Sequence, residues 1–173
     1  MLSRLSRPLL IWLASAAGVN AETGYAAGAG TATVVAEADL SVTDADPGEM
    51  LIGATVTIRA GSLVTAQDVL GVTDQLGITS SYVAGTGTLT LTGTTSAANY
   101  QTVLNTLMYD NTSDTPNTTA RTVPVTVQDI NGANSAAATS TGTVVASNDG
   151  PSPVNESVTG EEDTGLAGVE LLA

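Results

Sequence analysis

The sequence predicts an all-β protein, an antiparallel β-sandwich with one short helix between strands. Threonine and valine are abundant, and both favour the pleated, half-buried surface of a sheet. Apolar residues alternate with polar ones along several short runs, which is the period of a strand with one buried face. Turn residues separate these runs at short intervals, and helices do not alternate with strands.

The composition sets what the core is made of. Hydrophobic residues make up 42% of the chain but aromatic ones only 3%, so the core has to be built from aliphatic side chains and threonine methyls. Acidic chains rich in Gly, Ser and Thr can also be disordered. The positive mean hydropathy of +0.21 and the alternation in the middle of the chain favour a folded domain.

The first strands are predicted at residues 31–35, 40–43 and 52–58, with a turn over residues 44–48. The third run, IGATVTI, has the clearest alternation and places four apolar residues on one face: Ile52, Ala54, Val56 and Ile58.

Weaker strands are expected at residues 68–73 and 77–79, around a turn at Asp74 and Gln75. A hairpin follows, with strands at 80–84 and 88–92. Its connection, Gly85-Thr86-Gly87, contains the glycines that a tight turn with positive φ angles needs.

One segment breaks the β pattern. Between Thr95 and Leu107 the apolar residues recur at helical spacing, and Thr95-Ser96 can cap the first turn. We expect a short helix that packs across an open end or face of the sandwich through Tyr100, Val103, Leu104 and Leu107.

The best alternating strand is predicted at residues 119–130, with Val123, Val125 and Val127 on one face. Pro124 lies on the other face and indicates an edge or a bulge. The remaining expected elements are an extended stretch at 107–109, a loop at 111–117, a turn at Asn131-Gly132 and a last strand at 136–146.

The N-terminus is predicted to be an export signal. Arg4 and Arg7 precede an apolar stretch at residues 8–17, and Val19-Asn20-Ala21 provides a small-residue cleavage site. Residues 1–21 are therefore interpreted as a signal peptide, with an amphipathic helix of the mature fold as the alternative. This predicts an extracellular or cell-surface protein without a transmembrane span in its mature chain.

The charge and residue types narrow the function. Four basic residues stand against 17 acidic ones, a net charge of −13, which repels nucleic acid and attracts cations. The chain has no Cys and no His, and its four basic residues are all Arg. The commonest general base, thiol nucleophiles and the usual kinds of zinc site are thus missing. Ser and Thr nucleophiles have neither His nor Lys to activate them, and the carboxylates fall in turns, so we expect no enzyme.

Several motifs resemble a known family. Residues 97–135, the Leu40–Asp46 segment and the Asn-Asp-Gly-Pro at 148–151 are similar to cadherin-like or immunoglobulin-like tandem repeats of large bacterial surface proteins and RTX-type adhesins. The resemblance implies a Greek-key sandwich over residues 22–150. Residues 151–173 resemble a linker and the truncated opening strand of a second repeat, so the neighbouring repeats of the same or a longer chain are the expected partners.

The same resemblance implies Ca²⁺ shared between a repeat and the linker that follows it, since calcium is bound by carboxylate and carbonyl oxygens. Asp129 would contribute with four linker residues, and two further carboxylates could join if their turn lies at the same end. Asp and Asn also form ordinary turns, which is the alternative. The opening stretch Gly24–Gly28 lacks the Glu that related repeats often have. The candidate ligands are Asp44, Asp46, Asp129, Asn148, Asp149, Glu162 and Asp163.

These observations predict a structural spacer repeat of a secreted or cell-surface adhesin, with a possible cell-surface or glycan ligand. The alternative is a carbohydrate-binding β-sandwich module. Such a module would usually show a platform of aromatic side chains, and the mature chain offers four tyrosines, of which Tyr100 and Tyr109 are expected in the core.

Overall fold

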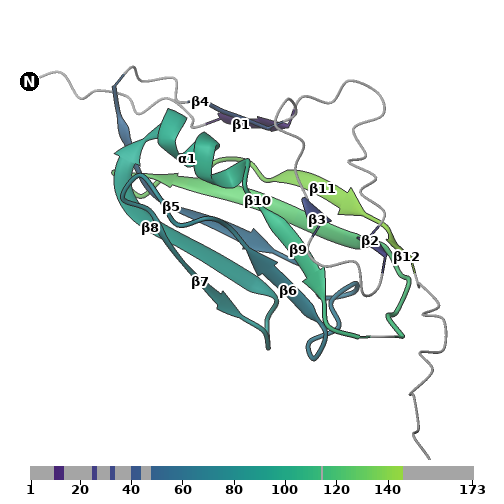
Figure 1. Cartoon of the computed structure of the whole chain (residues 1–173). Helices are drawn as coiled ribbons and strands as arrows, with labels where there is room; N and C mark the ends of the chain where they lie inside the picture. Colours follow the sequence, from purple (N-terminus) through teal and green to yellow (C-terminus); the bar gives the residue numbers. More distant parts are fainter. Residues whose placement is uncertain are drawn as a thin grey trace, which may run out of the picture.

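The computed structural model describes residues 10–13, 25–26, 32–33, 40–43, 48–113 and 115–145. Over this part the chain forms antiparallel sheets packed as a sandwich with one short helix, as the sequence predicts (Figure 1). The elements are β1 Leu10–Leu13, β2 Tyr25–Ala26, β3 Ala32–Thr33, β4 Leu40–Thr43, β5 Met50–Thr57, β6 Asp68–Gly71, β7 Thr79–Val83, β8 Thr88–Ser96, α1 Ala97–Leu104, β9 Met108–Asn111, β10 Arg121–Asp129, β11 Ala138–Gly142 and β12 Val144–Val145.

Two sheets make the sandwich. One has five strands in the order β11-β10-β5-β8-β7, and the other has three in the order β3-β9-β6. The chain crosses from one sheet to the other between β5 and β6, β6 and β7, β8 and β9, and β9 and β10, so the two sheets interlock. The pair β1-β4 is antiparallel and the short pair β12-β2 is parallel.

The inner face of the five-stranded sheet supplies most of the core. The predicted alternation is confirmed for Ala54, Val56 and Ile58 of the first long strand, and for all three valines of β10. Ile52 differs, because a register shift between Leu51 and Gly53 changes the alternation and buries Leu51 instead. A bulge of this kind is invisible to a pattern of strict period two.

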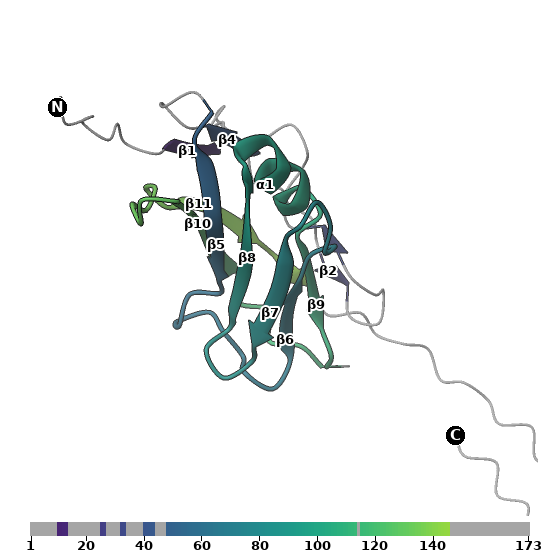
Figure 2. The same cartoon turned by 90° about the vertical axis from the view of Figure 1, so that its left-hand side faces the viewer.

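The helix α1 closes one end of the sandwich (Figure 2). It is shorter than predicted, and it begins after Ser96, whose Oγ accepts a hydrogen bond from the backbone N–H of Asn99 at 3.3 Å. The four predicted packing residues are all fully buried. Among the described residues, no helix is both long and apolar enough to cross a membrane.

Two turn predictions are confirmed and one is wrong. Gly87 and Gly132 adopt φ angles of 62° and 86°, as the expected turns require. The turn predicted at Asp74-Gln75 is formed instead by Leu76 (φ 55°) and Gly77 (φ 79°), between the bridged residues Gln75 and Ile78. Gly77 accepts the positive φ without strain, which moves the turn two residues along the chain.

Pro124 lies in an interior strand, not on the edge of the sheet. However, β10 pairs with β11 over residues 121–125 and with β5 only from Val125 onward. At Pro124 the strand therefore has a neighbour in the ladder on one side alone, which is where a residue without a backbone N–H is tolerated.

The sandwich has two distinct ends. The helix end contains α1, the start of β5 and the turn after Asp129. The exit end contains Asp68, Asn111 and Arg121, and there β11 finishes, with Gly142 opposite Arg121, before the chain enters β12. The nine residues of β10 connect the two ends over about 25 Å.

We predict that Gly93→Ala strongly destabilises the sandwich. Gly93 has a φ of 152°, and an added Cβ would lie 2.2 Å from the carbonyl oxygen of Gly77. Its own carbonyl accepts the Tyr100 hydroxyl at 2.6 Å, so the backbone cannot shift freely. Urea unfolding should show a loss of about 3 kcal/mol. The matched control, Gly61→Ala, has open space around the new Cβ, and equal losses for both variants would contradict the prediction.

Candidate functional site

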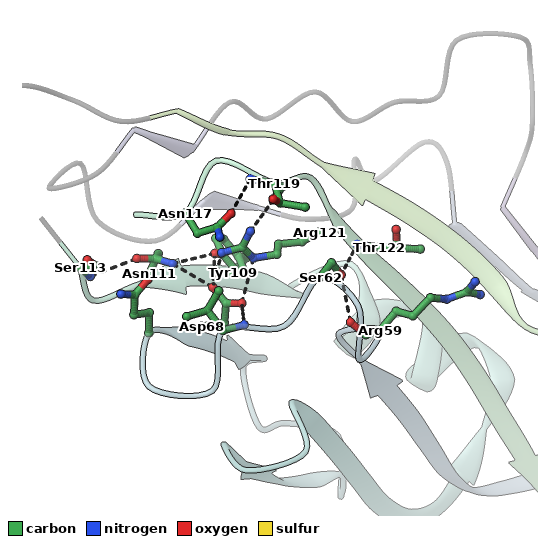
Figure 3. A network of polar contacts seen from close by, with 12 residues as sticks. Arg59, Ser62, Asp68, Tyr109, Asn111, Ser113, Asn117, Thr119, Arg121 and Thr122 are labelled. Atoms are coloured by element: carbon green, nitrogen blue, oxygen red, sulfur yellow. Dashed lines mark hydrogen bonds and ion pairs between the residues drawn. The ribbon is translucent and has the colours of Figure 1, made fainter. Parts of the chain in front are cut away.

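The buried carboxylate of Asp68, at the start of β6, lies in a network of polar contacts (Figure 3). Arg121 binds it in a bidentate manner, with Nε 2.8 Å from Oδ2 and Nη2 3.0 Å from Oδ1. The two side chains are 0% and 2% exposed. This is a fully buried ion pair of the geometry that guanidinium and carboxylate favour.

Three further donors complete the environment of the carboxylate. The Tyr109 hydroxyl and Asn111 Nδ2 donate to Oδ1 at 2.6 and 2.8 Å, and the backbone N–H of Val64 donates to Oδ2 at 2.7 Å. Asn111 is itself fixed, because its Oδ1 accepts the backbone N–H of Ser113 at 3.0 Å. We call Asp68, Tyr109, Asn111 and Arg121 the buried cluster.

Local structure brings these residues together. Asp68 and Asn111 are direct cross-strand partners in the β6-β9 ladder. Tyr109 precedes Asn111 by two positions and therefore projects from the same face of β9. Arg121 begins β10 in the opposite sheet, and its Nη1 also donates to the carbonyl of Thr119. The cluster thus connects both sheets of the sandwich at the exit end.

The neighbouring phenols are held in their protonated form. Burial raises the pKa of Tyr109, and the hydrogen bond to the Asp68 carboxylate raises it further. Burial raises the pKa of Tyr82, whose hydroxyl donates to the carbonyl of Asp68 at 2.7 Å. Burial likewise raises the pKa of Tyr100, to about 12. At neutral pH these hydroxyls are protonated and each donates a hydrogen bond, and that of Tyr109 also accepts one from Asn111 Nδ2 at 3.1 Å.

The buried cluster was not predicted from the sequence, although the alternation of buried positions places two of its residues on inward-facing positions. Arg121 has the same parity in its strand as the buried valines 123, 125 and 127, and Asp68 has that of buried Leu70. A charged residue on an inward position needs a partner. The partner lies 53 positions away, so periodicity alone does not identify it.

Of the predicted metal ligands, Asp129 lies in the described part of the chain. It is 2% exposed, at the helix end, and its Oδ1 accepts the backbone N–H groups of Asn131 at 2.9 Å and Ala133 at 2.8 Å. Asn131 Nδ2 in turn donates to Oε1 of Glu49. Asp129 therefore shapes the turn, the role that the sequence left open beside metal binding.

The other six predicted ligands lie outside the described residues. They are Asp44, Asp46, Asn148, Asp149, Glu162 and Asp163. Asn148 and Asp149 follow β12, which continues from the exit end, whereas Asp129 is at the helix end. Within the described ranges, no group of three or more His, Cys, Asp or Glu residues is placed to hold a metal ion.

The outer face of the five-stranded sheet carries a shallow groove of about 200 Å³. It lies beside the bulge at Gly53, because glycine has no side chain to fill the space. Its lining residues are uncharged, and four of the eleven are threonine. The lining residues are Ile52, Gly53, Ala54, Thr55, Thr90, Leu91, Thr92, Thr126, Val127, Gln128 and Asn134.

Comparisons with known proteins do not extend this picture. No protein-family model matches the sequence, and no curated protein matches it. The similarity to cadherin-like repeats thus stays a prediction based on the motifs, and the all-β sandwich is established by the structure.

We predict that Arg121→Met costs about 3–5 kcal/mol of unfolding free energy, because the Asp68 carboxylate is left buried without its counter-ion. Arg59→Met is the matched control, since Arg59 is exposed and its side chain points away from the buried cluster (Figure 3). Guanidinium unfolding of both variants measures the difference. A loss for Arg121→Met as small as that of the control would refute a stabilising role for the pair.

We also predict that the protein loses stability in alkaline solution. Tyr100 and Tyr109 have pKa values above their ordinary value of 10 in the folded chain, so below pH 10 both are protonated in either state and their contribution is complete. Above pH 10 the unfolded chain releases these protons first, and the free energy of unfolding falls as pH rises. Urea unfolding between pH 8 and about 12 should show this slope, and Tyr109→Phe should reduce it. An unchanged slope in that variant would contradict the assignment.

Proposed function

We propose that the chain is a structural spacer repeat of a secreted or cell-surface adhesin and has no catalytic role. The observation that carries the proposal is the buried cluster, which joins both sheets at the end where the chain leaves the sandwich. A spacer has to transmit force along its length without opening. A clamp at the exit end is the feature that such a role requires.

The path of force supports this role. A pull on β12 acts on β11, which pairs with β10 over residues 121–125. The strand β10 is bonded to β5 along its second half, and at its start Arg121 is bonded to Asp68 of β6. Force on the last strand is thereby shared by the central strand of one sheet and, through the ion pair, by the other sheet.

We propose that Ca²⁺ binds where two repeats meet. Asp44 and Asp46 belong to the short segment that leads to Gly48 and Glu49 at the helix end, where Asp129 also lies. The linker residues, by contrast, follow the exit end. In a tandem array the exit end of one repeat faces the helix end of the next, so each repeat would contribute ligands to two junctions. Glu162 and Asp163, in the predicted second repeat, could join the linker oxygens.

Calcium would act mechanically in this proposal. Without it the carboxylates at a junction repel one another, which keeps the joint loose. With it the same oxygens become ligands and the joint stiffens. A stiff array would hold a binding tip away from the cell surface.

Export is part of the same proposal and is supported by the Arg4-Arg7 and apolar pattern of residues 1–21. Within that segment Leu10–Leu13 forms β1 and pairs with β4. Cleavage after Ala21 would remove this partner and leave β4 beside α1, where the N–H of Val42 donates to Gln101 Oε1 at 3.3 Å.

A carbohydrate-binding module is the second candidate, and the uncharged groove beside Gly53 favours it. The tyrosines do not, because Tyr82, Tyr100 and Tyr109 direct their hydroxyls to Asp68 and Gly93 within the fold. Specific binding on a glycan array would favour the module, and an array without binding would favour the spacer.

We predict that saturating Ca²⁺ raises the thermal midpoint of the full chain, and raises that of two tandem copies of residues 22–151 by more, because only the tandem contains a complete junction. Replacing Asn148 and Asp149 with Ala should abolish the rise. Asp74→Ala is the control, since Asp74 is exposed and its carboxylate accepts a hydrogen bond from the Ser80 hydroxyl. Midpoints that are the same in calcium and in chelator, for both chains, would eliminate the calcium proposal.

A further inference from the structure

The turn after β10 contains a sequence with its own chemistry. Asn131 is the only asparagine in the sequence that is followed by Gly, and both residues are exposed at the helix end. Gly132 has a φ of 86° and no side chain to shield its backbone nitrogen. We propose that Asn131 is a site of spontaneous deamidation, and that the reaction switches the charge of the helix end irreversibly.

The reaction needs only water and base from the solvent. The backbone nitrogen of Gly132, after losing its proton, attacks Cγ of Asn131. A new C–N bond closes a five-membered succinimide, and the Cγ–Nδ2 bond breaks, so that Nδ2 takes up a proton and leaves as ammonia. Water then adds to one of the two ring carbonyls and opens the ring, which gives either aspartate or isoaspartate at position 131.

Asp129 controls access to this reaction. The N–H of Gly132 donates to the Asp129 carbonyl at 3.1 Å, and the N–H of Asn131 donates to Asp129 Oδ1 at 2.9 Å. The attacking nitrogen is therefore released only when this turn opens. Because Asn131 and Gly132 are exposed, the turn can open without unfolding the sheets.

The other asparagines are less reactive for a steric reason. A side chain on the following residue hinders the approach of its nitrogen to the amide carbon, and Asn111 is additionally buried in the cluster around Asp68. The residues that follow the other described asparagines are Tyr100, Thr106, Thr112, Thr118 and Ser135.

The product alters the contacts of the helix end. Asn131 Nδ2 now donates to the carboxylate of Glu49, but aspartate or isoaspartate has no donor there and carries a negative charge. Like charges then face each other beside the hydrogen bond from the N–H of Ile130 to the carbonyl of Met50 at 3.0 Å. This bond joins the turn to the start of β5, so we expect the repulsion to loosen the helix end.

The site is tested by incubating the full chain at neutral to mildly alkaline pH and mapping its peptides by mass spectrometry. Asn131 should convert to aspartate and isoaspartate several-fold faster than every other asparagine. Gly132→Ala should slow the conversion several-fold. Asp129→Ala should accelerate it, because the lost carboxylate holds the backbone N–H groups of Asn131 and Ala133 and its removal lets the turn open more often. Conversion of Asn131 at the rate of the remaining asparagines would overturn the proposal.

The charge switch is tested separately with variants that imitate the product. Asn131→Asp should lower the thermal midpoint by several degrees, and adding Glu49→Gln to it should restore most of the loss. Asn134→Asp is the matched control, because Asn134 is exposed three residues further along the chain and the substitution adds the same charge there. A midpoint of Asn131→Asp that Glu49→Gln leaves unchanged would show that the product does not act through this repulsion.

Discussion

The buried carboxylate of Asp68 is the constraint on which the sandwich depends. Moving a carboxylate and a guanidinium out of water costs several kcal/mol for each ion, and excellent geometry is needed to offset that cost. Here the carboxylate accepts five hydrogen bonds, from two strands and one turn. All five exist together only if β6 and β9 are in register and β10 begins at its native position. We infer that the cluster selects one pairing from the many that Thr- and Val-rich strands allow.

Different kinds of interaction close the two ends of the sandwich. At the exit end, an ion pair that is hidden from water holds β10 against the opposite sheet. At the helix end, apolar side chains of α1 cover the core, and the polar contact between Glu49 and Asn131 lies in solvent. Changes in salt, cations or covalent structure therefore act on the helix end first. At the exit end the hydroxyls of Tyr82 and Tyr109 keep their protons at neutral pH, because burial raises the pKa of both.

Local pattern was sufficient for most of the fold. The period of two in β5 and β10, the glycine turns and the capped helix all depend on neighbouring residues, and all are confirmed. One error was local, since the turn expected at Asp74-Gln75 lies at Leu76-Gly77. The others arose where a distant contact decides. The bulge at Leu51 depends on pairing with β8, and the Asp68 partners lie 41 to 53 positions along the chain. For Asp129, the sequence predicted the strand and the turn that follows it. It did not decide whether the carboxylate oxygens accept backbone N–H groups or bind a metal.

The ion pair also changes the balance of exposed charge. Beyond the first seven residues the chain has two arginines and 17 acidic residues. Arg121 is paired with Asp68 inside the protein, so Arg59 is the one exposed arginine of the described part, and 16 of the 17 acidic residues of the sequence remain. At physiological salt, exposed charges repel one another over about 8 Å. In the proposed tandem array, a compact junction between repeats would therefore need cations from solution to offset this repulsion.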